Sequence, residues 1–318
     1  MCFIICWKGN NGIFMLLNRA LFSVCICSYK NIEEIHKSVE SIVRQTYENI
    51  ELIVSDDCTP IINVKKKIED IIRPYEGRFT NIIINVNDTN LGTVKHLNYI
   101  LPKAKGTYIT LLGAGDELDS PDTIAHVVNY FETNVNIDIL IANRTLELPR
   151  KKKLLYPSRK YKKILLQGNS KKILKYECRV GRQLSSIGTF YRKQVIERYG
   201  FFDERFVIQE DSPFFLRALY NNEIFGYINL NACVHEAGGV SNLARKNSVF
   251  AQDCKNTLIY YKYPKRYEMD IFTRHVIELR YEMRVKNNYF ACLKYPIATA
   301  YLVFALFMDW IKRIRFLK

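Results

Sequence analysis

Between residue 21 and about residue 142, the chain alternates short apolar runs with segments that carry apolar residues at helical spacing. In the first such segment, Ile32, Ile35 and Val39 fall on one face of a helix. Four apolar runs are rich in β-branched residues and have the length of strands buried on both faces: residues 21–27, 51–54, 82–86 and 108–112. Strands that alternate with helices predict an α/β fold with a mostly parallel sheet flanked by helices.

Local capping patterns predict where two of the helices begin. Asn31, with Glu34 three residues later, predicts a capped helix start after the first strand. Ser120 followed by Pro121 predicts a helix that starts there, with a cap and a proline in its first turn. A further helix with a proline in its first turn is expected over residues 212–220.

Polar residues follow three of the predicted strands, at Tyr29, Asp56-Asp57 and Asp116. Parallel sheets bind ligands beyond the carboxyl ends of their strands, so these positions predict a binding site. The loop over residues 27–31 contains neither the Gly-x-Gly-x-x-Gly of a dinucleotide site nor the Gly-Lys-Ser/Thr of a P-loop. A Rossmann dehydrogenase and a P-loop NTPase are therefore excluded.

Several segments resemble, in order, the consecutive motifs of family 2 glycosyltransferases. They are residues 22–31, 41–57, 90–92, 104–112, 199–204 and 209–211, and together they cover roughly residues 21–240. The resemblance implies a Rossmann-like GT-A fold and transfer of a sugar from a nucleotide-diphosphate donor, with a UDP-sugar expected, and with inversion at the anomeric carbon.

The resemblance also assigns residues to the donor nucleotide. Ser28 and Tyr29 lie where the first loop of the family passes the nucleoside. Asp56 or Asp57 matches the family's carboxylate that accepts a hydrogen bond from the nucleotide base. The alternative for this Asp-Asp pair is a structural role in a turn or a helix cap.

The family's metal-binding motif is altered in this chain. Where the family has Asp-x-Asp and a further acid, residues 113–116 read Gly-Ala-Gly-Asp, so Asp116 remains unless Glu117 or Asp119 turns inward. One carboxylate can still anchor Mg²⁺ or Mn²⁺, because these ions keep waters and take ligands from substrate phosphates. His235 is the predicted second ligand of the metal, or contacts the diphosphate. The alternatives are a turn cap for Asp116 and a structural His235.

A second departure concerns the phosphate contacts. Leu97 stands where the family has an arginine, whereas Asn98 matches the residue that follows it. Lys95 is predicted to supply the missing positive charge towards the donor. The alternative is an ordinary exposed lysine on a helix.

The predicted catalytic pair is Glu210-Asp211, at the start of the helix over residues 212–220. Asp211 matches the family's general base, which removes the proton from the acceptor hydroxyl. A carboxylate at a helix start also serves as a cap, and this is the alternative for Asp211.

The chain carries a formal net charge of +15 and nine scattered cysteines without zinc-ligand spacing. The charge predicts an anionic partner, and the cysteines predict reduced thiols in a cytoplasmic protein. The apolar first residues lack the basic start of an export signal. We therefore expect an appendage over residues 1–14, the glycosyltransferase domain over residues 15–240, and a C-terminal helical, membrane-associating region over residues 241–318.

Two segments outside the motifs predict the acceptor and the location. Residues 150–175 contain eleven Lys or Arg and no acid, with Tyr156 and Tyr161 between them. This pattern would suit nucleic acid, but no nucleic-acid module surrounds it, so an anionic membrane or a pyrophosphate-linked lipid is expected instead. The apolar run over residues 296–311, with Tyr301, Trp310 and a basic tail, predicts an interfacial helix at the inner membrane. A core helix is the alternative.

Together these features predict an inverting glycosyltransferase, peripheral at the cytoplasmic face of the inner membrane, that extends a cell-surface glycan on a lipid-linked or polysaccharide acceptor. One alternative is a degenerate sugar-nucleotide binding protein without catalysis, in which Gly113 and Gly115 mark the lost motif. Another is a basic protein that interacts with nucleic acid or a membrane.

Overall fold

The computed structural model describes residues 20–148, 152–181, 183–236 and 248–315. The predicted appendage over residues 1–14 lies outside the described residues, as do the last three residues of the basic tail. Within the described chain, no disulfide joins the seven cysteines.

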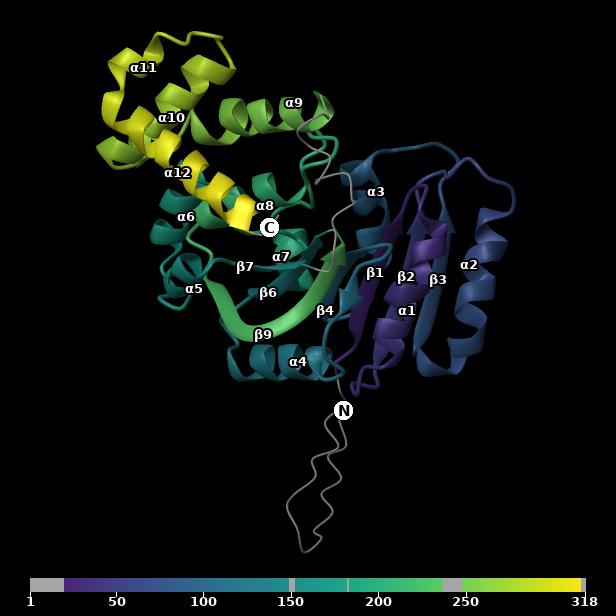
Figure 1. The fold of residues 1–318 in the computed structure, drawn as a ribbon. Helices are drawn as coiled ribbons and strands as arrows, with labels where there is room; N and C mark the ends of the chain where they lie inside the picture. The colour runs from purple at the N-terminus through teal and green to yellow at the C-terminus, as the bar shows by residue number, and fades with distance from the viewer. Residues whose placement is uncertain (1–19, 149–151, 182, 237–247, 316–318) are drawn as a thin grey trace, which may run out of the picture.

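The described residues form one nine-stranded, mostly parallel sheet (Figure 1). Its first half is parallel throughout, in the order β3 (Asn81–Val86), β2 (Ile50–Asp56), β1 (Phe22–Ser28) and β4 (Tyr108–Gly113). The second half mixes both directions, in the order β8 (Thr189–Arg192), β6 (Ile139–Leu148), β9 (Phe225–Glu236) and β5 (Glu117–Leu118), with β7 (Lys152–Tyr156) paired to β6. The predicted α/β class is confirmed.

Helices cover both faces of the sheet, and each face has its own apolar core. On one face the core contains side chains of α1 (Ile35–Val43), α2 (Val64–Ile72) and α4 (Thr123–Thr133). On the other face it contains side chains of α3 (Thr93–Ile100), α5 (Arg159–Leu165), α6 (Ser170–Arg179), α7 (Lys193–Arg198) and α8 (Asp211–Tyr220). Strands such as β2, in which every residue is buried, fit the continuous apolar runs of the sequence.

The C-terminal helices gather at one end of the molecule, beside α6 and α8 (Figure 1). They are α9 (Ser248–Thr257), α10 (Ile271–Arg284), α11 (Ala291–Lys294) and α12 (Pro296–Arg315). A third apolar cluster joins α10, α11 and the start of α12. In the part of the chain that the structure describes, no helix combines the length and hydropathy that a membrane span requires.

Helical structure begins directly after Asn31 as predicted, but without the predicted side-chain cap, and the second predicted helix begins later than expected. The side chain of Asn31 makes no cap; it accepts from the Tyr29 backbone and donates to the Ala114 carbonyl at 2.9 Å, so it joins two loops. Helix α4 begins at Thr123 instead of Ser120, because the Pro121 carbonyl accepts from the Thr46 backbone at 2.9 Å. Long-range contacts thus replace the side-chain cap at Asn31, whereas the Ser120 hydroxyl still accepts locally from the Asp122 backbone at 3.3 Å.

Two aromatic residues of the basic and C-terminal segments pack against other side chains. The ring of Tyr161 is fully buried in the core, so it cannot stack on a ligand. Tyr301 packs edge-on against Phe272 of α10, with 5.2 Å between ring centroids. The first turns of α12 therefore belong to the core, whereas later residues, such as Phe304 and Phe307, are exposed.

Candidate active site

Hydrogen bonds connect the loops that follow β1, β2 and β4 at the carboxyl edge of the sheet. The Ala114 backbone donates to the Cys27 carbonyl at 2.8 Å, and the Asp57 backbone donates to the Ser28 carbonyl at 2.9 Å. Lys30 donates its backbone N–H to the Thr59 hydroxyl at 2.7 Å. The three loops therefore form one connected surface at the edge where a parallel sheet binds its ligand.

The first aspartate of the pair holds a turn. Asp56 is completely buried, and its two oxygens accept from the Thr59 backbone and from the Thr59 hydroxyl, each at 2.7 Å. This geometry matches the structural alternative considered for the Asp-Asp pair.

The second aspartate organises the loop after β3. Asp57 accepts from the Asn87 side chain and from the backbone N–H groups of Leu91 and Gly92, each at 2.9 Å. Gly92 has a φ of +77°, which few other residues adopt without strain. Asp57 therefore fixes the Asn-Leu-Gly segment through two backbone hydrogen bonds, and the start of the same loop through Asn87.

Ser28 and Tyr29 lie at the same edge with different exposure. Ser28 is buried, and its hydroxyl is 3.4 Å from Oδ1 of Asn31. The ring of Tyr29 is exposed, and Lys30 Nζ lies 4.9 Å from its centroid. Tyr29 thus presents an open aromatic face, which is suited to stacking on a base.

Asp116 folds back onto the strand end, which explains the glycine at position 113. One carboxylate oxygen accepts from the Gly113 backbone at 2.8 Å, and the other lies 2.5 Å from Nδ1 of His235. A Cβ at position 113 would lie only 3.1 Å from the first oxygen, so a larger residue there would crowd the carboxylate. Gly115 adopts a φ of +97° in the same turn.

The structure therefore brings together the two predicted metal ligands. Asp116 is buried, and His235 of β9 contacts it across the edge of the sheet. Among the described residues, no group of three or more His, Cys, Asp or Glu side chains gathers at metal-binding distances. The pair offers one oxygen and one nitrogen, so a bound Mg²⁺ or Mn²⁺ would take its other ligands from phosphate and water.

Lys95 and Asn98 occupy different environments on α3. Lys95 is exposed, as in the alternative considered for it. The amide of Asn98 accepts from the Phe202 backbone at 2.9 Å and donates to the Phe202 carbonyl at 2.8 Å. Asn98 therefore anchors the loop that leads to Glu210, and this contact uses both ends of its amide.

Glu210 and Asp211 lie side by side at the start of α8, in a protein environment that disfavours their charge. Glu210 accepts from the Ser186 hydroxyl at 2.5 Å, and Asp211 accepts from the Ser212 backbone at 2.6 Å. Burial, followed by the negative charge of Asp211, raises the pKa of Glu210 to about 8. Burial also raises the pKa of Asp211, while the positive charge of Arg144 opposes that rise. The two carboxyl groups titrate as a pair.

The predicted catalytic pair and the loops after β1, β2 and β4 belong to the same edge. The charges of Glu210 and Asp57 both act on the Cys27 thiol at the end of β1, where burial is the main cause of a raised pKa. The backbone of Val94 donates to the Val207 carbonyl at 3.1 Å, so the segment before Glu210 contacts the start of α3. Residues far apart in the sequence thus form one site.

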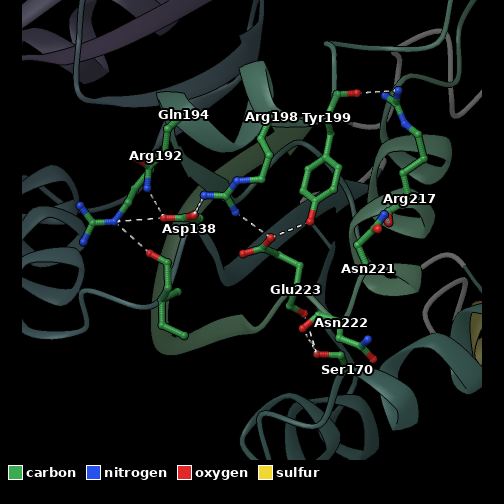
Figure 2. A network of polar contacts seen from close by, with 11 residues as sticks. Asp138, Ser170, Arg192, Gln194, Arg198, Tyr199, Arg217, Asn221, Asn222 and Glu223 are labelled. Atoms are coloured by element: carbon green, nitrogen blue, oxygen red, sulfur yellow. Dashed lines mark hydrogen bonds and ion pairs between the residues drawn. The ribbon is translucent and has the colours of Figure 1, made fainter.

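A network of polar contacts holds α8 in position (Figure 2). Arg217 of α8 donates to the Tyr199 carbonyl at 2.8 Å, and the Tyr199 hydroxyl donates to Glu223 at 2.7 Å. Arg198 bridges Glu223 and Asp138, at 3.1 and 2.7 Å. The helix that begins at the catalytic pair is therefore tied to β6 and α7.

Three residues of the site had no recognisable signal in the sequence. Asp253 of α9 is buried and accepts from three consecutive backbone N–H groups, those of residues 207–209, directly before Glu210. Arg144 and Ser186 contact or face the catalytic pair from β6 and the loop before β8. Their partners lie 24 to 67 positions away in the chain, so no local motif reveals them.

The comparisons with known sequences agree on one family. The family model described as glycosyl transferase family 2 matches residues 23–200. The chain is 34% identical over 120 residues to an uncharacterized glycosyltransferase of Haemophilus influenzae, and the match covers 38% of this chain and 35% of that protein. It is 33% identical over 118 residues to the glucosyltransferase WfaP of Escherichia coli, covering 36% of this chain and 42% of WfaP. The chain thus spans less than half the length of these two curated relatives.

Solved structures show the same fold. TarS of S. aureus, residues 1–349 with UDP-GlcNAc, superposes with a TM-score of 0.62 at 18% identity, covering 83% of this chain and 72% of TarS. The mannosyltransferase PcManGT of Pyrobaculum calidifontis, with GDP-Man and Mn²⁺, gives a TM-score of 0.59 at 13% identity, covering 93% and 82%. The GT-A fold is confirmed. Because the family model spans more than half of its 318 residues, the chain belongs to glycosyltransferase family 2.

Proposed function

We propose that this chain is an inverting glycosyltransferase that moves a sugar from a UDP-sugar to a lipid-linked or polysaccharide acceptor in cell-surface glycan synthesis. The observation that carries the proposal is the carboxyl pair Glu210-Asp211, whose pKa values are raised by burial at the same edge of the sheet as the donor loops. A general base is effective when its pKa lies near the working pH.

Asp211 is the proposed base for the acceptor hydroxyl. With a pKa of about 8, Glu210 holds a proton at neutral pH, so the pair carries one negative charge instead of two. The remaining charge lies on Asp211, since Arg144 favours its ionised form. A carboxylate with a raised pKa accepts a proton more readily than one at its ordinary pKa.

The donor lies, in this proposal, on the loops after β1, β2 and β4. Tyr29 stacks on the nucleoside. Asp57 shapes the Asn-Leu-Gly loop and accepts a hydrogen bond from the nucleotide base. Asp116 and His235 would hold Mg²⁺ or Mn²⁺, which would supply positive charge to the departing diphosphate. TarS with UDP-GlcNAc and PcManGT with GDP-Man and Mn²⁺ support these assignments through the shared fold.

The acceptor and the location complete the proposal. WfaP carries UDP-Glc and a diphosphoundecaprenol acceptor in its name, and a lipid-linked acceptor is proposed here by analogy. Exposed basic side chains such as Lys153, Lys160 and Lys171 would attract an anionic membrane, and the exposed apolar residues of α12 would enter its interface. We place the protein at the cytoplasmic face of the inner membrane.

Donor turnover tests the proposal. Purified protein is incubated with a panel of UDP-sugars and Mn²⁺, and UDP release is followed without acceptor. We expect slow hydrolysis of one donor, because water replaces the acceptor in a competent site. A sugar-nucleotide binding protein without catalysis would show a thermal shift with UDP and no release from any donor.

A further inference from the structure

A cavity of about 320 Å³ lies between the end of α6, α10 and α12. This volume falls at the lower end of the roughly 300–1,000 Å³ of small-molecule sites. Its walls are mostly apolar and include Leu279, Met283 and Leu302. Buried residues such as Gly181 and exposed ones such as Val303 both line it, so the cavity reaches from the interior to the surface.

The outer end of the cavity continues into an apolar surface on α12. Val303 and Leu306 line the cavity and are 61% and 67% exposed. Beyond them Phe304, Phe307 and Met308 are also exposed. Several large apolar side chains in water on one helix mark a surface that contacts an apolar partner.

The cavity carries positive charge. Arg280 and Arg284 line it, and none of the described residues in its walls is acidic. An apolar cavity with arginines suits a molecule that joins a hydrocarbon chain to a phosphate. Each guanidinium group can donate two parallel hydrogen bonds to phosphate oxygens. A purely apolar peptide segment would offer no phosphate oxygens to these arginines.

The inner end of the cavity contacts a neighbour of the catalytic pair. Tyr156 and Gln183 both line the cavity. Arg144 lies 5.1 Å above the Tyr156 ring and donates to the Gln183 carbonyl at 3.1 Å. The charge of Arg144 in turn acts on Asp211. A phosphate at this end of the cavity would therefore lie between the hydrocarbon site and the proposed base.

We propose that the cavity binds the first isoprenoid or acyl units of the lipid that carries the acceptor sugar. The chain continues along the exposed face of α12, and the phosphates lie towards Arg280 and Arg144. The inference rests on the proposed function, because it requires a lipid-linked acceptor. It goes further by assigning the lipid to a cavity in the C-terminal helices.

Farnesyl diphosphate is a suitable probe, and inorganic pyrophosphate separates the hydrocarbon contribution from the phosphate contribution. Calorimetry should show that farnesyl diphosphate binds the full chain at least about tenfold more tightly than pyrophosphate, since burying apolar chain is favourable. Ala305→Trp fills the cavity and should weaken farnesyl diphosphate binding about tenfold while UDP binding is unchanged. Ala300→Trp, on the same helix but outside the cavity, is the matched control and should bind as the wild type does.

A second pair covers the case in which Ala305→Trp disturbs packing. Val303→Glu places a carboxylate at an exposed wall position, and Ile297→Glu places one at an exposed position outside the cavity. Val303→Glu should reduce farnesyl diphosphate binding, whereas Ile297→Glu should not. Equal binding in all four variants, or equal affinity for pyrophosphate and farnesyl diphosphate, would overturn the proposal. Normal UDP release together with that result would leave the glycosyltransferase function standing, whereas absent UDP release would refute the function itself.

Discussion

The carboxylates of the donor loops and those at the start of α8 lie at one edge of the sheet but have opposite environments. Asp57 accepts three hydrogen bonds from the protein, two of them from backbone N–H groups. Glu210 accepts from a single hydroxyl, that of Ser186, and burial raises its pKa. Burial raises the pKa of a carboxyl group towards the range in which it exchanges protons, whereas hydrogen bonds from a loop fix the shape of that loop. On this difference we propose that Asp57 shapes its loop and that the pair at the start of α8 performs the proton transfer.

Apart from replacing the proposed base itself, removing the support of the segment before Glu210 should have the largest effect. Asp253→Ala leaves the backbone N–H groups of residues 207–209 without their acceptor, and Glu210 follows directly. We expect kcat for UDP release to fall about 10- to 100-fold, as for small misplacements of catalytic groups, with the donor KM changed little. Asp253→Asn keeps one acceptor and should recover part of the rate. An unchanged kcat in Asp253→Ala would remove the positioning role.

Substitution in the donor loops should affect UDP affinity instead of kcat. Asp57→Asn loses the acceptor for the Gly92 backbone, so the loop after β3 loosens. UDP affinity should fall about tenfold, which corresponds to about 1.4 kcal/mol and to one charge-assisted hydrogen bond. Asp56→Asn, whose partners lie in a single turn, should lower the melting temperature with less effect on UDP affinity. A larger loss of UDP affinity in Asp56→Asn than in Asp57→Asn would contradict this assignment.

Adding a metal ion should change UDP affinity by a smaller factor. Mn²⁺ should tighten UDP binding several-fold, roughly the effect of one shared cation on the diphosphate. Asp116→Ala should abolish that tightening while leaving the affinity in EDTA nearly intact, and His235→Ala should do so in part. Equal affinity with EDTA and with Mn²⁺ in the wild type would indicate an enzyme that is independent of cations.

The smallest effect concerns stability and pH. The folded-state pKa of Glu210, about 8, lies above its ordinary value of 4.5, so the folded protein binds the extra proton more tightly than the unfolded chain. Its contribution to stability is therefore present below pH 4.5 and is lost as pH rises to about 8. Glu210→Gln lacks this titrating group. Between pH 5 and pH 8, the melting temperature of the variant should therefore fall by a few degrees less than that of the wild type. Parallel melting curves of variant and wild type would contradict the raised pKa.

The sequence predicts the parts of the fold that depend on local patterns. The four parallel strands, the helix with Pro213 and the polar strand ends follow from apolar periodicity and turn residues. The side-chain cap at Asn31 is wrong because its amide makes tertiary contacts, and α4 begins at Thr123, after the predicted start, because the Pro121 carbonyl accepts from Thr46. Asp253 is absent from the predicted site because its partners lie 44 to 46 positions away. The predicted boundary after residue 240 also separates Asp253 from the segment that it holds.

The claim that Asp211 performs the chemistry while the donor loops bind is tested most directly by Asp211→Asn. UDP affinity and UDP release are measured in this variant and in Glu76→Gln, an exposed carboxylate change before β3, at the opposite edge of the sheet. We predict that Asp211→Asn binds UDP as the wild type does and releases it about 10²- to 10⁴-fold more slowly from the donor, the usual contribution of a general base. Turnover equal to that of Glu76→Gln would show that Asp211 is not the base.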